Sequence, residues 1–195
     1  EGTVRTYLYT LRRFQRVLQG RAMDQGTAEE FVRHLEATGN SSRSIGRHIY
    51  ALRAYFAFKS VALDLGAPAF LKRLPRWLTD DEWASVLETA ERPLRDKRFP
   101  NRARVKALFY RAALMVYGGA GLRLSEGCSL KREDVDPGGY LRVLSKGGRE
   151  DIVPVENAVV AAIADWVATH DSPWVFPGRS DRHLQPRTMQ AAIRQ

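Results

Sequence analysis

The sequence lacks several features that define common classes of protein. It has a single cysteine, Cys128, so it can form neither a disulfide framework nor a thiolate metal cluster. Its longest uncharged apolar stretch, residues 112–122, is too short to span a bilayer. Its first residues contain no apolar segment typical of a secretory signal peptide. We therefore expect a cytoplasmic protein that is not bound in a membrane.

Motifs for metals and cofactors are missing as well. The 4 histidines do not show the spacing of metal ligands. The glycines at 118, 119 and 121 follow no predicted strand, so they do not form a dinucleotide-binding fingerprint. We expect neither a metal nor a cofactor.

What the sequence does have is an excess of positive charge. It carries 31 basic and 22 acidic residues, a net charge of +9. Residues 1–65 and 66–110 each carry 10 basic and 6 acidic residues, whereas residues 111–195 carry 11 and 10. This balance favours a polyanionic partner, either nucleic acid or an anionic membrane surface. Composition alone leaves open a basic protein without such a partner.

The first third of the chain reads as helices. Apolar residues recur with a period near 3.6 over residues 4–18 and again over 45–56. Thr27 with Glu30 matches a capping box for a second helix that begins at Thr27. The serines at 41, 42 and 44 offer caps for the third helix. Glycine and proline interrupt the pattern in residues 64–76. We therefore expect a helical domain over residues 1–63 and a linker over 64–76.

Residues 77–195 predict a second, mixed domain. Thr79 and Glu82 form another capping box, and Asn101 is the expected cap of the following helix. Residues 140–144 and 151–155 alternate like two strands, joined by a turn with two glycines. Helices are expected after them, one with Pro186 in its first turn. The fold class is mainly α, with a small antiparallel sheet in an α+β second domain.

Two basic residues stand out as candidates for chemistry. Arg123 follows an apolar, glycine-rich stretch, and Glu126 lies three residues later, on the same helix face. A guanidinium can bind two phosphate oxygens at once. The alternative is an ordinary ion pair worth about 0.3 kcal/mol. Lys146 lies in the glycine turn between the strands, where it can donate a proton or simply be solvated.

These residues are part of a longer pattern that resembles the tyrosine recombinases, the family of phage integrases and Xer-type recombinases. The first catalytic box of the family matches Gly121, Leu122, Arg123, Ser125, Glu126, Leu130 and Asp134. The hairpin that follows it matches Lys146 and then Val153-Pro154. Residues 1–63 resemble the helical, SAM-like core-binding domain, so the resemblance covers nearly the whole chain.

The resemblance implies a function. Family members are integrases and site-specific recombinases that cleave and rejoin DNA through a 3′-phosphotyrosyl intermediate, without metal or cofactor. It implies that Arg123 binds the scissile phosphate, that Lys146 protonates the leaving 5′ oxygen and that Glu126 orients Arg123. It also implies a C-shaped clamp on double-stranded DNA and a homotetramer on paired recombination sites.

Further basic residues are candidates for contact with the DNA backbone. They lie in the third expected helix, in the linker and beside the hairpin turn: Arg43, Arg47, Arg53, Lys72, Arg73, Arg76 and Arg149. The alternative is a solvated basic surface, to which we give equal weight for the third helix.

The chain departs from the family pattern in one important respect. The second box, His-x-x-Arg, and the tyrosine nucleophile after it are absent, and the last tyrosine is Tyr140. Asp151 stands where the hairpin often carries arginine. We expect the natural protein to extend past Gln195, and the 195 residues to bind DNA without cleaving it. The alternatives are a non-catalytic DNA-binding protein or regulator derived from a recombinase, and an RNA-binding or structural helical protein.

Overall fold

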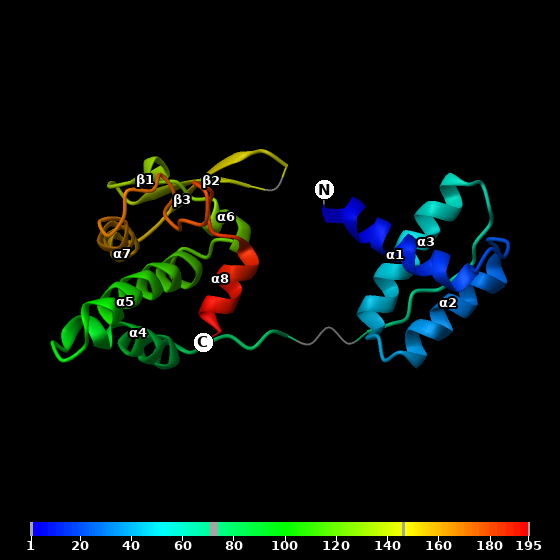
Figure 1. Ribbon diagram of the computed structural model, residues 1–195, viewed down its shortest axis with the longest axis horizontal. Coiled ribbons are helices and arrows are strands. Elements are labelled where there is room, and N and C mark those ends of the chain that lie inside the picture. Colours follow the sequence, from blue (N-terminus) through cyan, green and yellow to red (C-terminus); the bar gives the residue numbers. More distant parts are fainter. Residues whose placement is uncertain (1, 71–73, 146, 195) are drawn as a thin grey trace. The chain divides into compact units, whose positions relative to one another are not determined.

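The computed structural model describes residues 2–70, 74–145 and 147–194. The chain divides into two compact units, Glu1–Arg76 and Trp77–Gln195, each with its own hydrophobic core. The expected mainly helical fold with a small antiparallel sheet is confirmed (Figure 1). Among the described residues, no helix is both long and apolar enough to cross a membrane.

The first unit is built from three helices: α1 Gly2–Leu18, α2 Gln25–Ala37 and α3 Ser42–Phe58. One aromatic side chain from each helix meets the others at the centre. The ring centroid of Phe14 lies 5.4 Å from that of Phe31 and 6.0 Å from that of Phe56, and all three rings are buried. The apolar face of each helix therefore faces a common core. Ser41 caps α3, as the serine-rich segment predicts.

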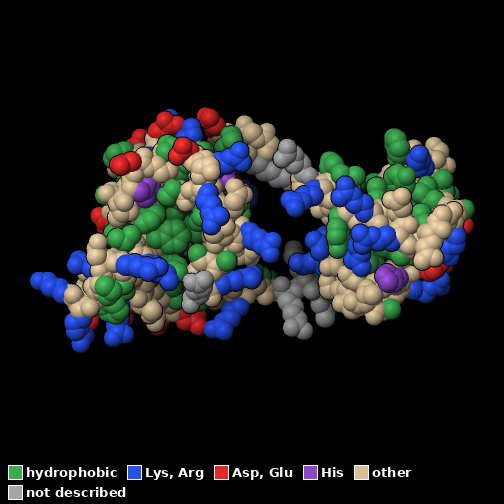
Figure 2. Space-filling model, in the orientation of Figure 1, with side chains coloured by type: hydrophobic (Ala, Val, Ile, Leu, Met, Phe, Trp, Pro, Cys, Tyr) green, Lys and Arg blue, Asp and Glu red, His purple; other side chains and the backbone are tan. Residues whose placement is uncertain are grey.

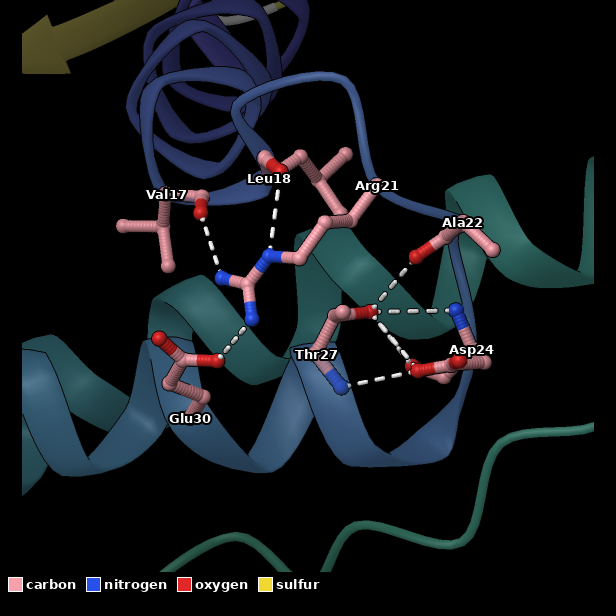
Figure 3. Close-up of polar contacts among 7 residues, drawn as sticks. All are labelled: Val17, Leu18, Arg21, Ala22, Asp24, Thr27 and Glu30. Atoms are coloured by element: carbon pink, nitrogen blue, oxygen red, sulfur yellow. Dashed lines mark hydrogen bonds and ion pairs between the residues drawn. The ribbon is translucent and has the colours of Figure 1, made fainter.

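The corner between α1 and α2 corrects one expectation (Figure 3). The N-cap of α2 is Asp24 and not Thr27. The Asp24 carboxylate accepts the Thr27 backbone N–H at 2.8 Å, and Thr27 Oγ1 accepts the Asp24 backbone N–H at 3.0 Å. Glu30 instead pairs with Arg21 at 2.8 Å, while the Arg21 guanidinium also donates to two carbonyls in the last turn of α1. The predicted capping box was therefore placed three residues too late.

The segment after α3 packs back onto the helical core. The Gln25 side chain exchanges two hydrogen bonds with the backbone of Asp64, at 2.8 and 2.9 Å. The Arg53 guanidinium donates to the carbonyl of Leu65, whose side chain is buried in the core. The helical unit thus includes ordered contacts beyond its last helix.

The second unit contains five α-helices and three strands within its described residues. The helices are α4 Asp80–Arg95, α5 Asn101–Leu114, α6 Leu124–Cys128, α7 Asn157–Val167 and α8 Pro186–Ile193. The strands are β1 Val135–Asp136, β2 Tyr140–Leu144 and β3 Glu150–Pro154. A π-helical turn, Met115–Gly119, continues α5, and a 3₁₀ turn, Arg132–Asp134, precedes β1. Pro186 occupies the first turn of α8, as predicted.

Helix α5 lies between α4 and α7 (Figure 1). Thr79 caps α4 with the predicted box: its Oγ1 accepts the Glu82 N–H at 3.2 Å, and Glu82 accepts the Thr79 N–H at 2.9 Å. Asn101 is not the cap of α5, because the helix already includes it and Pro100 takes that position without a side-chain bond. Arg111 of α5 pairs with Glu91 at 3.0 Å and with Asp165 at 2.6 Å, which ties the three helices together.

The sheet has the strand order β1-β2-β3, with both pairs antiparallel. Leu141 and Val143 of β2 point into the core, and the alternate residues Tyr140, Arg142 and Leu144 point to solvent. The third strand begins one residue earlier than expected, at Glu150, and the short β1 was not predicted. The register of β2 against β3 pairs Leu144 with Glu150, and the predicted general acid Lys146 lies outside the described residues.

Candidate active site

The chain approaches the candidate site through the π turn at the end of α5. Ala120 donates its N–H to the carbonyl of Met115 at 2.8 Å, a bond that spans five residues. Gly118 packs so closely on Trp83 that a Cβ there would lie 2.3 Å from the indole ring. Gly121 has a φ of +66°, a conformation that glycine adopts without steric cost. The glycine-rich stretch therefore has a geometric purpose, which is to turn the chain toward α6.

Arg123 lies at the start of α6 and is held there by Glu126. Its Nη1 donates to Glu126 Oε1 at 2.6 Å, and its backbone N–H donates to Oε2 at 2.9 Å. The Arg123 side chain is 71% exposed, whereas that of Glu126 is 7% exposed. A buried carboxylate thus fixes one edge of the guanidinium and leaves most of this cation open to a ligand. The predicted pairing of these two residues is present.

Each residue of this pair stabilises the ionised form of the other. Burial of the Glu126 carboxylate raises its pKa, but hydrogen bonds from the Arg123 side chain and backbone, with the Arg123 charge, outweigh burial. The net pKa of Glu126 is lowered, so the carboxylate stays ionised at neutral pH. The hydrogen bond to Glu126 in turn raises the pKa of Arg123. The result is a fixed positive group suited to an anion such as a phosphodiester.

A third residue joins the pair from the base of the hairpin. Ser145 Oγ lies 3.5 Å from Glu126 Oε1, and the Ser145 backbone N–H donates to the carbonyl of Arg149 at 2.7 Å. Ser145 directly precedes Lys146, so the carboxylate that holds Arg123 also contacts the hairpin that carries the predicted general acid. Sequence reasoning missed Ser145, because only the fold brings it beside Glu126.

The predicted DNA-contact residues have different environments. Arg43 lies over the ring of Phe70 at 4.9 Å, and Arg47 donates to Ser44 Oγ at 3.1 Å. Arg53 is engaged within the protein through Leu65, as described above. Arg76 and Arg149 are exposed, whereas Lys72 and Arg73 lie outside the described residues. Arg43 and Arg47 are both exposed on α3.

Two further observations bear on the chemistry of the site. Tyr117, the tyrosine nearest to Arg123 in sequence, is packed inside the second unit, with its hydroxyl 3.5 Å from both the Leu124 carbonyl and Cys128 Sγ. Burial, followed by the contact with Cys128, raises the pKa of this phenol well above its usual range. In residues 2–70, 74–145 and 147–194, no three His, Cys, Asp or Glu side chains cluster as metal ligands.

Fold and site together define a mainly helical protein whose second, mixed unit presents an exposed arginine held by a buried glutamate. Residues 76–195 match the sequence profile of the "Phage integrase family", and residues 1–61 match "Phage integrase, N-terminal SAM-like domain". The chain therefore belongs to the phage integrase family of tyrosine recombinases.

Curated relatives agree with this assignment. The chain is 35% identical over 191 residues to tyrosine recombinase XerC of Xanthomonas axonopodis pv. citri (strain 306), covering 88% of this chain and 58% of the relative. It is 34% identical over 200 residues to tyrosine recombinase XerA of Pyrococcus horikoshii, covering 97% and 64%. The chain thus spans less than two thirds of the length of these relatives.

Solved structures show the same fold. XerH site-specific recombinase, bound to its difH substrate in a pre-cleavage complex, matches with a TM-score of 0.65 at 16% identity, over 98% of this chain and 64% of that one. A lambda integrase tetramer bound to a Holliday junction matches with a TM-score of 0.64 at 16% identity, over 100% and 68%.

Proposed function

We propose that this chain is part of a site-specific DNA recombinase that cleaves and rejoins strands through a 3′-phosphotyrosyl intermediate. The observation that carries the proposal is the exposed Arg123 guanidinium, fixed by the buried Glu126. Support comes from family membership and from relatives named as tyrosine recombinases. Related folds have been solved on recombination substrates and a Holliday junction. The protein would act in the cytoplasm on double-stranded DNA.

In this proposal Arg123 binds the scissile phosphodiester. As a tyrosine oxygen attacks phosphorus and the bond to the 5′ oxygen breaks, negative charge grows on the other phosphoryl oxygens. A guanidinium already held in place stabilises that charge without reorganising. Glu126 supplies this preorganisation, because its buried carboxylate holds one edge of the group.

Lys146 would supply the proton that the departing 5′ oxygen needs. A lysine in a hairpin turn can reach a bound strand, and its ammonium becomes neutral as the 5′ hydroxyl forms. In the reverse step a 5′ hydroxyl returns its proton and attacks the phosphotyrosyl bond. The contact between Ser145 and Glu126 would keep the base of this hairpin close to Arg123.

DNA binding would use the exposed arginines of α3, Arg43 and Arg47, with Lys72, Arg73, Arg76 and Arg149 following the backbone. Arg53 has a structural partner in Leu65, so its contribution to DNA binding would be smaller than that of Arg47. Four protomers of the whole protein would assemble on paired sites. The tetramer described for lambda integrase supports this part of the proposal.

The 195 residues themselves would bind DNA without cleaving it. The 7 tyrosines all lie at or before Tyr140. Tyr117, the nearest to Arg123 in sequence, is a poor nucleophile, since its hydroxyl is packed against Leu124 and Cys128 and its pKa is raised by burial. A nucleophile from outside these residues would complete the site.

The test compares binding to duplex DNA and duplex RNA over a range of salt concentrations. We expect preferential DNA binding that weakens as salt rises, and no covalent adduct that survives denaturation. Arg123→Ala should lower DNA affinity about fivefold, in line with the loss of one charged contact. Arg142→Ala, an exposed arginine on the sheet, is the matched control. Equal binding to RNA would overturn the DNA proposal, and an adduct would overturn the statement about the nucleophile.

A further inference from the structure

A cleft between α1 and α3 lies outside the candidate active site. It has a volume of about 290 Å³ and is lined by Arg5, Thr6, Tyr9, Arg47 and His48. Its two arginines come from different helices and are both exposed. Lys and Arg side chains gather on the visible face of the helical unit in Figure 2, over the region where Figure 1 places α1. Only Arg47 of these lining residues was singled out from the sequence.

The arginines of the cleft are available to a ligand. No acidic side chain in the described part of the chain pairs with Arg5 or Arg47. Arg47 makes one hydrogen bond, to Ser44 Oγ at 3.1 Å, and a guanidinium has several N–H donors. The cleft therefore presents two cations from opposite walls, an arrangement that suits a phosphate.

The hydrogen-bond partners of the cleft histidine favour one tautomer. Thr10 Oγ1, which is buried, lies 3.1 Å from the carbonyl of Thr6 and 2.8 Å from His48 Nδ1. A hydroxyl has a single hydrogen, and the Thr6 carbonyl can only accept. Both contacts are satisfied when Thr10 donates to Thr6 and accepts from a protonated Nδ1. His48 Nε2 then carries a lone pair, and no described residue bonds to it.

The ring is neutral at neutral pH. Burial lowers the pKa of His48, and the charges of Arg13 and Arg47 lower it further. The cleft therefore combines cationic donors with one acceptor nitrogen. A simple anion would satisfy the donors but would leave the lone pair of Nε2 without a donor. A ligand that offers both an anionic oxygen and an N–H group satisfies all of them.

We propose that this cleft binds one nucleotide of duplex DNA, with Arg5 and Arg47 on a backbone phosphate and His48 Nε2 accepting from a base amino group. Cytosine N4 and adenine N6 offer such a group in the major groove. Tyr9, an exposed ring 6.2 Å from the His48 ring, borders the same space. The inference rests on the proposed function and assigns a base-reading role to a residue that otherwise ties α1 to α3.

The phosphate half of the site is tested by salt dependence. Arg5→Ala and Arg47→Ala should each lower the slope of log affinity against log salt by about one, for every DNA sequence alike. Arg16→Ala, an exposed arginine further along α1 and outside the cleft, is the control and should leave the slope unchanged. Cleft variants that behave like Arg16→Ala would overturn the phosphate contact.

The base-reading half is tested on duplexes selected from a random pool by the wild-type chain. Each adenine or cytosine of the selected site is replaced in turn by an analogue without the exocyclic amino group. At one position the analogue should weaken wild-type binding about fivefold, in line with one lost hydrogen bond, and leave His48→Leu unaffected. If no position distinguishes the two proteins, or if selection yields no preferred sequence, the base contact is wrong.

Two controls separate the possible failures. Far-UV circular dichroism of His48→Leu shows whether the helices persist, and His48→Phe, which keeps a planar ring but has no acceptor, serves if Leu disturbs the fold. A wild-type chain that does not bind duplex DNA contradicts the proposed function itself. A wild-type chain that binds, with cleft variants that bind equally well, contradicts only this inference.

Discussion

Each unit of the protein buries one titratable side chain that bears on its proposed role, and the two side chains differ in their charge. In the first unit His48 is 8% exposed, and its lowered pKa keeps it neutral. In the second unit Glu126 is 7% exposed, and its lowered pKa keeps it charged. The shift has the same direction in both, but burial causes it in His48, whereas Arg123 overcomes burial in Glu126.

The difference teaches how each unit presents its cations. The first unit keeps a neutral interior and exposes arginines such as Arg5 and Arg47 without acidic partners among the described residues. That arrangement suits binding, which tolerates mobile side chains. The second unit places a charge inside to fix Arg123 in one position. That arrangement suits catalysis, which requires a preorganised group.

The largest expected effect is a loss of stability in the second unit when a side chain is added at Gly127. A Cβ at Gly127 would lie 2.4 Å from the Tyr117 ring, which is packed in the core. Gly127→Ala should therefore destabilise this unit by about 2 kcal/mol. All 4 tryptophans lie at or after Trp77, so tryptophan fluorescence during urea unfolding reports the second unit alone. The cost should shrink in a Tyr117→Leu background, and an unchanged cost would contradict the clash.

A smaller effect is expected when the buried negative charge of Glu126 is removed. Glu126→Gln keeps the shape of the side chain but loses charge-assisted hydrogen bonds to Arg123, and should cost the second unit about 1 kcal/mol at neutral pH. Because the folded-state pKa of Glu126 is lowered, this contribution is complete above the usual value of 4.5 and is lost as pH falls through the lowered value. Glu133→Gln, in an exposed pair with Lys131, is the control and should change little.

A third change should stabilise the first unit. Gly46 lies inside α3, and a Cβ there would meet nothing within 4 Å. Gly46→Ala should raise the stability of this unit by about 0.5 kcal/mol, because alanine loses less backbone entropy in a helix. Hydrogen exchange of peptides from α3, measured by mass spectrometry, isolates the first unit. Faster exchange than in the wild type would show that the position is not open.

The smallest expected effect is a dependence on pH. Since the pKa of His48 is lowered by burial and by neighbouring arginines, its contribution to stability is present above 6.5 and is lost as pH falls through the folded-state value. Wild type should therefore lose stability relative to His48→Leu between pH 8 and pH 5, measured by circular dichroism in urea. His170, whose pKa is also lowered, is present in both proteins and cancels in the difference.

The sequence predicted features that depend on local chemistry. Ser41, one of the three serines that offered a cap, begins α3, and Thr79 begins α4 with the predicted box. Thr27 was taken as a cap although it occupies position N3 of a box headed by Asp24, since both residues are good caps. Glu30, the expected partner of Thr27, pairs with Arg21 at this corner, and the cap of α2 is Asp24. The ion pair between Arg123 and Glu126 was predictable because the two residues are three positions apart in the sequence.

Features that depend on contacts between distant segments were not predictable. The π turn forms where Gly118 meets Trp83, and Ser145 reaches Glu126 only when the hairpin packs beside α6. The cleft at His48 needs α1 and α3 to cross. One signal was present: a histidine occupies a core-facing position of α3, where an apolar residue is usual, and its partner Thr10 occupies one in α1.

The π turn also makes the site sensitive to the length of the chain. A π turn holds more residues per turn than an α-helix, in which each residue advances the chain by about 100° around the axis. Deleting one residue from Met115–Gly119 would let the segment return to α-helical geometry and rotate the start of α6 around that axis. Such a deletion would retain Arg123 and Glu126 in the sequence and still misdirect them, so the site depends on the spacing of this segment as well as on the identity of its residues.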